Sequence, residues 1–512
     1  MVIWLFSHKW RVSLLMSKLE EFHSMFYPRS VAVVGVSTNP QGWGGHAFIR
    51  RLKKVGFPGD IYAVNPKATN EVHGVKAYPS VKDIPVPPDM VIVSVPARRV
   101  PEVLEDCIAA GVKNVHIFSS GFSETQEEEG RQLEARIVEI IKRGNLRVVG
   151  PNCMGLYVPA SKFTAWGAPP KGVGNMAFIS QSGGHGEILS RYAQELGIYF
   201  SKIISFGNAR GLQALDFLEY LAEDPDTGII GMYLEGMSDG NRFTRLVKEI
   251  NRTKPVIIWK GGLTESGARA AASHTASMAG EARIWDAFFA QTGAIRVNSL
   301  EEMADVALLF LHLKPFRGRR VLLLGGGGGN AVAMADICSR DGLTVPTLAE
   351  DTRRQLAEFI PLAGNSIRNP LDVWLVQHNL EMFRRCIEIA AADPAIDLII
   401  ADRYPHDDDM DDDGPPNFAE QSQRVDEFIV EFAKNNPFGK PLVVAVNAPT
   451  NDPNGVKAAA ELRLKFALAG VPAYQSQASA TRALSRFIGY HEFLAKTQEV
   501  GAEPTLASCC RS

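Results

Sequence analysis

The sequence lacks a disulfide framework, a strong net charge and a long hydrophobic run. Its six cysteines, at positions 107, 153, 338, 386, 509 and 510, have neither disulfide-framework nor paired zinc-ligand spacing, which indicates reduced thiols in the cytoplasm. The 54 basic and 57 acidic residues give a formal net charge of −3, so electrostatics give no reason to expect a nucleic-acid partner. No segment has the roughly 20 unbroken apolar residues of a membrane span, and we expect no membrane partner.

The beginning of the chain lacks the features of a secretory signal. The apolar run at residues 2–6 is too short for a signal core, and no small-residue cleavage site follows it. We therefore expect residues 1–16 to be a disordered extension. A chain of 512 residues is too long for a single hydrophobic core and suggests about three domains. Its composition, 46% hydrophobic and 22% charged residues, fits an ordinary soluble globular protein.

Apolar runs without polar alternation recur along the first 150 residues. Each ends in Asn, Pro, Ser or Gly, with helical stretches between them, which is the pattern of strands buried on both faces of a parallel sheet. The runs are 30–37, 61–67, 90–96, 114–120 and 146–150. The first run leads into Gly42, Gly44 and Gly45, as at the opening of a nucleotide-binding α/β unit, but without a complete Gly-x-Gly-x-x-Gly motif.

Polar residues and glycines follow the ends of these runs. Ligands of open parallel sheets bind at the carboxyl ends of the strands, so we expect these residues to share one crevice. They are Ser37, Asn65, Lys67, Pro96, Ser120, Gly121 and Asn152.

A second series of strand-like runs starts at residue 175. Its first run leads into Ser182, Gly183 and Gly184 and then a helix over 185–196. Serine and glycine at a helix start present free N–H groups to an anion, although a plain strand-to-helix turn explains this spacing equally well. Glu235 directly follows a later apolar run and is a candidate functional acid, while capping or a salt bridge would also explain it.

His274 lies in the stretch of small residues 271–280, after the apolar run 255–260. On a small-residue loop between a strand and a helix, an imidazole can approach a ligand without steric obstruction. Its neutral nitrogen is a nucleophile at cellular pH. A lone loop histidine is more often structural or merely exposed, so a functional assignment depends on its neighbours.

A third series begins with the run 320–325, which enters a glycine-rich turn before a helix over 331–340. The runs 398–401 and 441–447 continue the α/β alternation. The acidic stretch 406–413 lacks the ligand spacing of a calcium loop, so a solvated surface loop is the better interpretation and we predict no metal site. The sequence therefore predicts three α/β units, with joints near 150–172 and 312–320. Prolines and glycines within 150–172 favour a linker there.

Several motifs occur in one order along the chain. They are Gly150-Pro-Asn-Cys-Met-Gly155, Ile179-Ser-Gln-Ser-Gly183, Ser205-Phe-Gly-Asn208, Tyr233-Leu-Glu-Gly236, Lys260-Gly-Gly262 and Ser273-His-Thr275. With these motifs the sequence resembles the α-subunit portion of NDP-forming acyl-CoA synthetases, the relatives of succinyl-CoA synthetase, over roughly residues 25–495. Asn369-Pro-Leu-Asp372 and the glycine-rich turn 325–329 match the third domain of that family.

The resemblance implies three α/β domains. Residues 17–150 would form a Rossmann-like coenzyme A-binding domain and residues 151–315 a flavodoxin-like domain with a phosphorylated histidine. Residues 316–498 would form a second flavodoxin-like domain, followed by a tail over 499–512.

The resemblance also assigns roles to individual residues. By motif match, the phosphorylated histidine is His274, and the glutamate that supports it is Glu235. The helix start that holds phosphate falls on Ser182, Gly183 and Gly184. The coenzyme A crevice would take in Ser37, Lys67, Pro96, Ser120, Gly121 and Asn152, with Cys153 close by.

The implied activity is that of an acid–CoA ligase. It would interconvert acyl-CoA, phosphate and ADP with a carboxylic acid, coenzyme A and ATP, through an acyl phosphate and phospho-His274. The ATP-grasp module that binds ATP or ADP and Mg²⁺ in the family is absent from the sequence. We therefore expect a separate ATP-grasp β subunit, activity only in its presence, and a hetero-oligomer or a homodimer.

Two other functions fit parts of the sequence. A coenzyme A-binding regulatory or scaffold protein that has lost phosphoryl transfer would share the fold. A nicotinamide dehydrogenase is disfavoured, because Asn65-Pro-Lys67 stands where an acid would hold the ribose.

Three positions depart from the family pattern. His185 lies in a Gly184-His185-Gly186 sequence where Ala-Leu-Gly is usual, and it could assist phosphoryl transfer, compete with it or shape the acyl pocket. Ala276 replaces a glycine close to His274, and Gly211 stands where aspartate is common.

Overall fold

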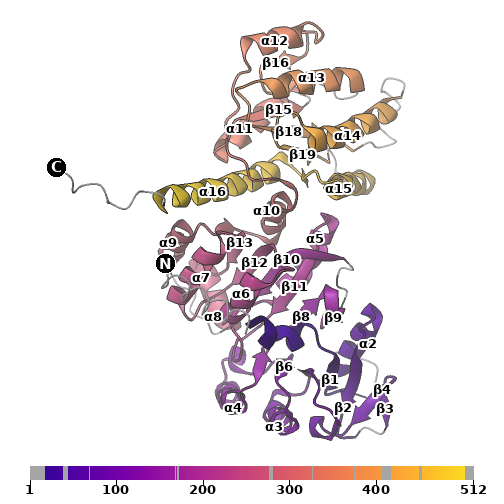
Figure 1. Ribbon diagram of the computed structural model, residues 1–512, viewed down its shortest axis with the longest axis vertical. Helices are drawn as coiled ribbons and strands as arrows, with labels where there is room; N and C mark the ends of the chain where they lie inside the picture. Colours follow the sequence, from indigo (N-terminus) through magenta and orange to yellow (C-terminus); the bar gives the residue numbers. More distant parts are fainter. Residues whose placement is uncertain are drawn as a thin grey trace, which may run out of the picture. The chain divides into compact units, whose positions relative to one another are not determined.

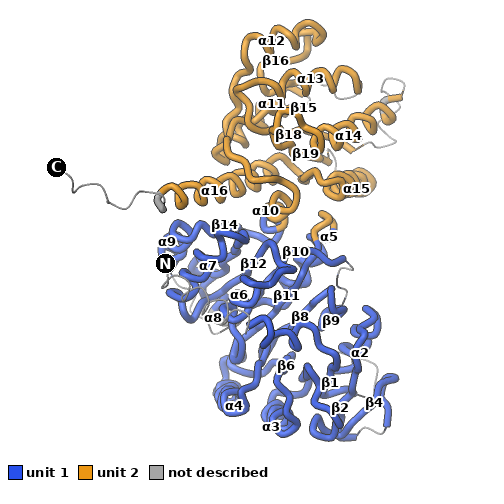
Figure 2. Tube along the Cα trace, in the orientation of Figure 1, with its two compact units in different colours: residues 1–194, 199–303 blue, residues 195–198, 304–512 orange. Residues whose placement is uncertain are grey.

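The computed structural model of the chain describes residues 18–37, 44–67, 70–167, 169, 172–275, 281–325, 327–373, 376, 379–405, 417–448 and 452–501. Its contacts divide the chain into two compact units (Figure 2). Unit 1 holds residues 1–194 and 199–303, and unit 2 holds residues 195–198 and 304–512. Unit 1 contains two β-sheets and unit 2 contains one (Figure 1).

The first sheet has the strand order β3-β4-β2-β1-β5-β6-β7. All neighbouring strands are parallel except the β3–β4 pair, and the order of the parallel strands is that of a dinucleotide-binding fold. Its strands are β1 (Ser30–Val34), β2 (Asp60–Val64), β3 (Glu71–Val72), β4 (Val75–Tyr78), β5 (Met90–Val93), β6 (Asn114–Ile117) and β7 (Arg147–Val149). Its helices are α2 (Gly45–Val55), α3 (Val100–Ala110), η3 (Ser123–Thr125) and α4 (Glu128–Gly144).

The second sheet has the order β14-β13-β12-β10-β11-β8-β9. Its strands are β8 (Gly155–Val158), β9 (Phe163–Thr164), β10 (Val173–Ser180), β11 (Phe200–Ser205), β12 (Ile229–Leu234), β13 (Val256–Lys260) and β14 (Ile295–Val297). Its helices are α5 (Gly183–Glu195), α6 (Ala214–Glu223), α7 (Gly240–Ile250), α8 (Glu265–Thr275) and α9 (Ala282–Thr292).

The prediction of a linker over residues 150–172 is wrong for much of that segment. Strands β8 and β9 lie within it and extend the second sheet in antiparallel fashion. They form because Leu156, Val158 and Phe163 are almost fully buried, so burial outweighs the local preference of the neighbouring prolines for turns.

Unit 2 contains the third sheet, with the order β16-β17-β15-β18-β19-β20. Its strands are β15 (Val321–Gly325), β16 (Ser366–Ile367), β17 (Leu371–Asp372), β18 (Leu398–Arg403), β19 (Leu442–Val446) and β20 (Ala473–Tyr474). Its helices are α10 (Leu300–His312), α11 (Gly328–Arg340), α12 (Glu350–Ala357), α13 (Leu380–Ala392), α14 (Phe418–Asn435), α15 (Pro453–Leu468) and α16 (Gln477–Gly501). The acidic stretch 406–413 lies outside the described residues.

The predicted α/β fold class with three mainly parallel sheets is therefore confirmed. The central strands β1, β5, β12 and β15 consist mainly of buried residues, as runs without polar alternation predict. Within the described ranges, no helix combines the length and the apolar composition needed to cross a bilayer.

Candidate active site

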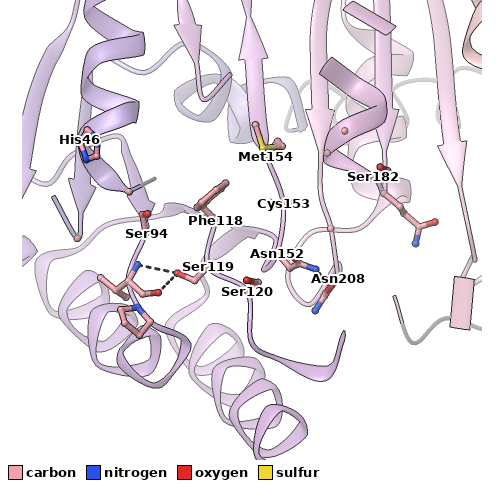
Figure 3. Close-up of a pocket in the computed structure, with 18 of the residues that line it drawn as sticks. His46, Ser94, Phe118, Ser119, Ser120, Asn152, Cys153, Met154, Ser182 and Asn208 are labelled. Carbon is pink, nitrogen blue, oxygen red and sulfur yellow. Dashed lines mark hydrogen bonds between the residues drawn. The ribbon is translucent and has the colours of Figure 1, made fainter. Parts of the chain in front are cut away.

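A cavity of about 700 Å³ lies in unit 1, where loops after strands of the first sheet meet loops of the second sheet (Figure 3). The first sheet contributes Gly35, Ser37, Gly44, His46, Ser94, Val95, Pro96, Phe118, Ser119 and Ser120. The second sheet and the segment that leads into it contribute Asn152, Cys153, Met154, Gln181, Ser182, Gly183, Gly184, Gly207 and Asn208. Unless otherwise stated, "the cavity" below refers to this one.

Most of the residues assigned to the coenzyme A crevice and the phosphate helix from the sequence line this one cavity. They are Ser37, Pro96, Ser120, Asn152, Ser182, Gly183 and Gly184. Gly121 lines an adjoining hollow of about 390 Å³, together with Pro96 and Ser120. Lys67 is exposed and lines neither the cavity nor the adjoining hollow. Its backbone N–H donates to Oδ1 of Asn65 over 2.8 Å.

The wall from the first sheet depends on close backbone packing. Gly35 has a φ of 91°, and a Cβ there would lie 2.1 Å from the carbonyl oxygen of Ser94, so only glycine fits. The Ser119 hydroxyl donates to the carbonyl of Val95 over 2.5 Å and accepts from its N–H over 3.1 Å (dashed lines in Figure 3). These contacts hold the β5 and β6 loops together. Ser94 and Ser119 adjoin predicted strand ends, and that position was the only sequence signal for them.

A chain of amides and carboxylates joins the two walls. Asn152 donates from Nδ2 to Oδ1 of Asn208 over 3.3 Å, and Asn208 donates to Oε2 of Glu124 over 2.6 Å. Oε1 of Glu124 accepts from the N–H groups of Gly121 and Phe122, over 2.6 and 3.1 Å. Burial opposes ionisation of Glu124, but these hydrogen bonds outweigh it and hold the pKa of the carboxyl below its usual range. The η3 loop of the first sheet is thereby tied to the β11 loop of the second.

Helix α5 starts at the edge of the cavity. Ser182, Gly183 and Gly184 all line it, and the N–H of His185 donates to the Ser182 hydroxyl over 3.4 Å. Ser180 holds this turn from behind, because its hydroxyl donates to the Ser182 carbonyl over 2.6 Å and accepts from the Ser182 N–H over 3.1 Å. N–H groups at a helix start and the positive end of the dipole favour an anion at this edge.

Glu235 follows β12 and is 5% exposed. It is connected to the cavity through Gln181, whose Oε1 accepts from the N–H groups of Glu235 and Gly236, the latter over 3.1 Å. The Tyr233 hydroxyl donates to Oε1 of Glu235 over 3.1 Å. The sequence motifs contain Gln181 but suggest no role for it, because its partner lies 54 residues away.

Lys260 supports Glu235 from the next strand. Its Nζ donates to the backbone carbonyl of Glu235 over 2.8 Å and to the carbonyl of Gly261. Burial lowers the pKa of Lys260 to about 8, although the nearby charge of Glu235 acts in the opposite direction.

His185 lies in the first turn of α5. Its ring meets Tyr233 edge-on with centroids 4.2 Å apart and tilts over Trp259 at 4.9 Å. The residue that departs from the family pattern therefore packs on the tyrosine that holds Glu235.

His274 lies in the last turn of α8, so the prediction of a loop around it is wrong as far as Thr275. Alanines before it favour helix strongly enough to extend the element through this position. The side chain of His274 and residues 276–280 lie outside the described part of the chain. Helix α8 packs against η3, the segment that carries Glu124.

The cavity suits an anionic ligand. Among the described residues that line it, none carries a carboxylate, whereas serine hydroxyls and backbone N–H groups offer hydrogen-bond donors on both walls. Coenzyme A, with its phosphates and amide-rich arm, fits this donor set. Within the described ranges, no group of three or more His, Cys, Asp or Glu side chains is placed to hold a metal ion.

Two protein-family models match the chain. A coenzyme A binding domain matches residues 29–159, and a succinyl-CoA ligase-like flavodoxin domain matches residues 173–310. These two matches cover the sheets that form the cavity.

Full-length relatives extend the similarity. The chain is 35% identical over 480 residues to the α subunit of ADP-forming acetate–CoA ligase I from Pyrococcus furiosus, covering 93% of this chain and 99% of the relative. It is 38% identical over 379 residues to ADP-forming acetate–CoA ligase I from Archaeoglobus fulgidus, where the match covers 73% of this chain and 54% of the relative. The chain thus matches only about half the length of that relative.

One solved structure has nearly the same fold. It is the dinucleotide-forming acetyl-coenzyme A synthetase 1 of Ca. Korarchaeum cryptofilum in complex with phosphate and ADP, with a TM-score of 0.78 and 31% identity. The match covers 94% of this chain and 99% of that one.

Proposed function

Because this chain belongs to the family of ADP-forming acetate–CoA ligases, we propose that it is the α subunit of an NDP-forming acid–CoA ligase. The enzyme interconverts acyl-CoA, phosphate and ADP with a carboxylic acid, coenzyme A and ATP. The observation that carries this proposal is the single cavity that joins strand ends of the coenzyme A-binding domain to the start of α5. Glu235 is bonded to the lining residue Gln181. The helix that contains His274 packs against η3, whose Glu124 accepts a hydrogen bond from the lining residue Asn208.

Coenzyme A occupies the cavity along the wall formed by the first sheet and faces Asn152 on the opposite wall. Ser37, Pro96, Ser120 and Asn152 surround its inner part, and Gly121 borders the adjoining hollow. We assign exposed Lys67 to the phosphates at the outer end of the coenzyme. The donors on this wall are hydroxyl and backbone N–H groups, which match the amides and phosphates of the ligand.

The reaction proceeds through two phosphorylated intermediates. A phosphate oxygen attacks the thioester carbon, the thiolate of coenzyme A leaves, and an acyl phosphate forms. A neutral ring nitrogen of His274 then attacks the phosphorus, and the carboxylate of the acid leaves. Transfer of the phosphoryl group from His274 to ADP completes ATP synthesis, and each step reverses when the acid is activated.

Three parts of this chain assist the transfer. The α5 start at Ser182, Gly183 and Gly184 stabilises negative charge on the moving phosphoryl group. The carboxylate of Glu235 accepts a hydrogen bond from the second ring nitrogen of His274, which selects the reactive tautomer and favours the cationic phosphohistidine. Tyr233, Gln181 and Lys260 keep Glu235 in place.

The remaining components come from a partner. We place ATP or ADP and Mg²⁺ on a separate ATP-grasp β subunit, with which this chain forms a hetero-oligomer. The high coverage of an α-subunit relative supports this arrangement. We place the enzyme in the cytoplasm, in keeping with the four described cysteines, which are all free thiols.

Phosphohistidine formation tests the proposal. With its partner subunit and γ-labelled ATP, the chain should become labelled, and His274→Asn should abolish the label while coenzyme A still binds in a calorimetric titration. Label that survives His274→Asn would overturn the assignment of His274. A wild-type complex that binds coenzyme A but never takes up label would instead indicate the binding-only regulatory or scaffold protein.

A further inference from the structure

Unit 1 contains another cavity, of about 600 Å³, that shares no lining residue with the candidate active site. It lies between the carboxyl-terminal part of α2, strands β8 and β9, and the start of β10. Helix α2 packs directly on β9, which brings these segments together (Figure 1). We call it the basic-aromatic cavity, after Arg51, Lys54, Lys162, Tyr157 and Trp166, which all line it.

Two buried aromatic rings form its apolar wall. Tyr157 is 4% exposed and Trp166 is 2% exposed. Trp166 packs against α5, since a Cβ at Gly186 would lie 2.0 Å from the tip of its indole ring. Among the described residues, nothing accepts a hydrogen bond from the buried indole N–H of Trp166. This N–H is itself closed to solvent, so Trp166 offers the cavity the apolar part of its ring.

The polar part of the wall is cationic. Arg51, Lys54 and Lys162 line the cavity, and within the described ranges no carboxylate does. Arg51 is half-buried and donates from Nη1 to the carbonyl of Ala165 over 2.7 Å, a neutral partner. Burial lowers the pKa of Arg51, and the charge of Glu187 acts in the opposite direction. That carboxylate is already paired with Arg191 one turn further along α5.

We propose that the basic-aromatic cavity binds an amphipathic carboxylate with an aromatic or alkyl body. The body lies on Tyr157 and Trp166, and the carboxylate pairs with Arg51 and the two lysines. A volume near 600 Å³ falls within the usual range for small-molecule sites, which combine apolar walls with a few polar anchors. Guanidinium is the cation best suited to a carboxylate because its N–H groups match both oxygens.

The site does not depend on the proposed ligase reaction, because its lining contains none of the residues assigned to coenzyme A or to phosphoryl transfer. It does share two helices with the candidate active site. Helix α2 places His46 in the first cavity and Arg51 in the second, and α5 has Gly183 at the first and Gly186 against Trp166 at the second. A ligand in the basic-aromatic cavity therefore contacts or adjoins the elements that shape the first cavity.

The probe for this site is 2-naphthoate, with the neutral amide 2-naphthamide as its isosteric control. Calorimetric titration of the full chain should give one site for naphthoate and at least tenfold weaker binding of naphthamide. The double variant Lys54→Gln/Lys162→Gln should weaken naphthoate binding about fivefold, the size expected for two solvent-screened charge pairs. The matched double variant Lys113→Gln/Lys142→Gln removes the same charge from exposed positions elsewhere and should leave binding unchanged.

Two further measurements locate the probe. Ala160 is exposed and lines the basic-aromatic cavity, so Ala160→Trp should fill it and abolish naphthoate binding with little change in the melting temperature. Saturating coenzyme A should not displace the probe. The proposal is overturned by absence of naphthoate binding, by equal binding of naphthamide, or by displacement with coenzyme A. Unchanged affinity in the lysine double variant would overturn it as well, even if Ala160→Trp failed to fold.

Discussion

The hydroxyl of Tyr233 donates a hydrogen bond across 3.1 Å to Oε1 of Glu235, and both side chains are buried. The ring of His185 packs edge-on against Tyr233, so the first turn of α5 and the carboxylate share one neighbour. In the proposed reaction, α5 holds the phosphoryl group and Glu235 orients the histidine that receives it. Tyr233 thus links the two groups that must be positioned together.

Removal of this hydroxyl should slow phosphoryl transfer. Tyr233→Phe keeps the ring packing and removes the hydrogen bond to Glu235, an interaction with a charged group of roughly 1.5–3 kcal/mol. We expect phospho-His274 to form roughly ten- to a hundredfold more slowly, since each 1.36 kcal/mol corresponds to a factor of ten. Rapid-quench labelling from γ-labelled ATP with the partner subunit measures the rate.

Tyr62→Phe is the matched control. Tyr62 donates to Asp60, also two residues away, over 3.3 Å at the surface of the first sheet. It should label at the wild-type rate. Equal labelling rates in Tyr233→Phe and Tyr62→Phe would show that the hydroxyl of Tyr233 does not position Glu235.

The buried amine of Lys260 should make stability depend on pH. Its pKa is about 8 in the folded chain and about 10.4 when unfolded, so the unfolded state binds more protons between these values. The free energy of unfolding of the wild type should therefore rise with pH over this window, by roughly 3 kcal/mol in total, relative to Lys260→Met. Subtracting the variant cancels the shared titration of tyrosines and cysteines.

Urea unfolding of both proteins at pH 7.5, 9 and 10 measures this difference. Asn251→Ala, whose side chain lies in the same unit at the other end of β13, should show no such pH dependence relative to wild type. A wild-type-minus-Lys260→Met difference that stays flat from pH 7.5 to 10 would contradict a depressed pKa at Lys260.

Asn208 should contribute to coenzyme A binding. It lines the cavity and ties the β11 loop to Glu124, which in turn holds the N–H of Gly121. Asn208→Ala leaves Glu124 without this donor and loosens the wall, so we expect the dissociation constant for coenzyme A to rise about tenfold. Calorimetric titration measures it. Asn175→Ala, at an exposed position near the start of β10, should bind like wild type, and similar affinities for both variants would remove Asn208 from the site.

Two glycines of α5 should respond oppositely to alanine. At Gly186 the new Cβ would lie 2.0 Å from the Trp166 ring, so Gly186→Ala should destabilise the chain by roughly 1–3 kcal/mol. At Gly184 the new Cβ would lie 4.0 Å from Oγ of Ser182, and alanine should stabilise the helix by roughly 0.5–1 kcal/mol. Chemical unfolding separates the two, and equal stabilities would contradict the close packing of Trp166 on α5.

Local patterns were sufficient for the repeating part of the fold. Continuous apolar runs such as 90–96 and 229–234 predicted buried parallel strands, since such runs have no polar face to leave in water. The same reasoning missed β8 and β9, because prolines at 151 and 159 indicate a break when read locally. It also missed α8, because the small residues around His274 resembled a loop although alanine favours helix.

The sequence predicted that several strand ends would meet in one place, but it predicted few of the contacts around that place. Ordered motifs identified Glu235 and the Ser182 turn, and strand ends such as Ser37 and Ser120 do line one cavity. The contacts made by Gln181 and Asn208 were not foreseen, because each joins residues far apart in the chain, 54 positions to Glu235 and 84 to Glu124.

The sequence by itself determined that buried strands alternate with helices and that glycine- and serine-rich turns precede some of the helices. Short stretches of sequence are sufficient for this, because strand burial and the residues at a helix start are local properties. Which turns meet is settled only when the sheets form. The order of strands in the second sheet places Gln181 beside Glu235, and the packing of the first sheet against the second places Asn208 beside Glu124. The same packing brings Arg51 and Trp166 together in the lining of a separate basic cavity. Hydrogen bonds and charge pairs act over only a few ångströms, so such partners exist only in the assembled fold.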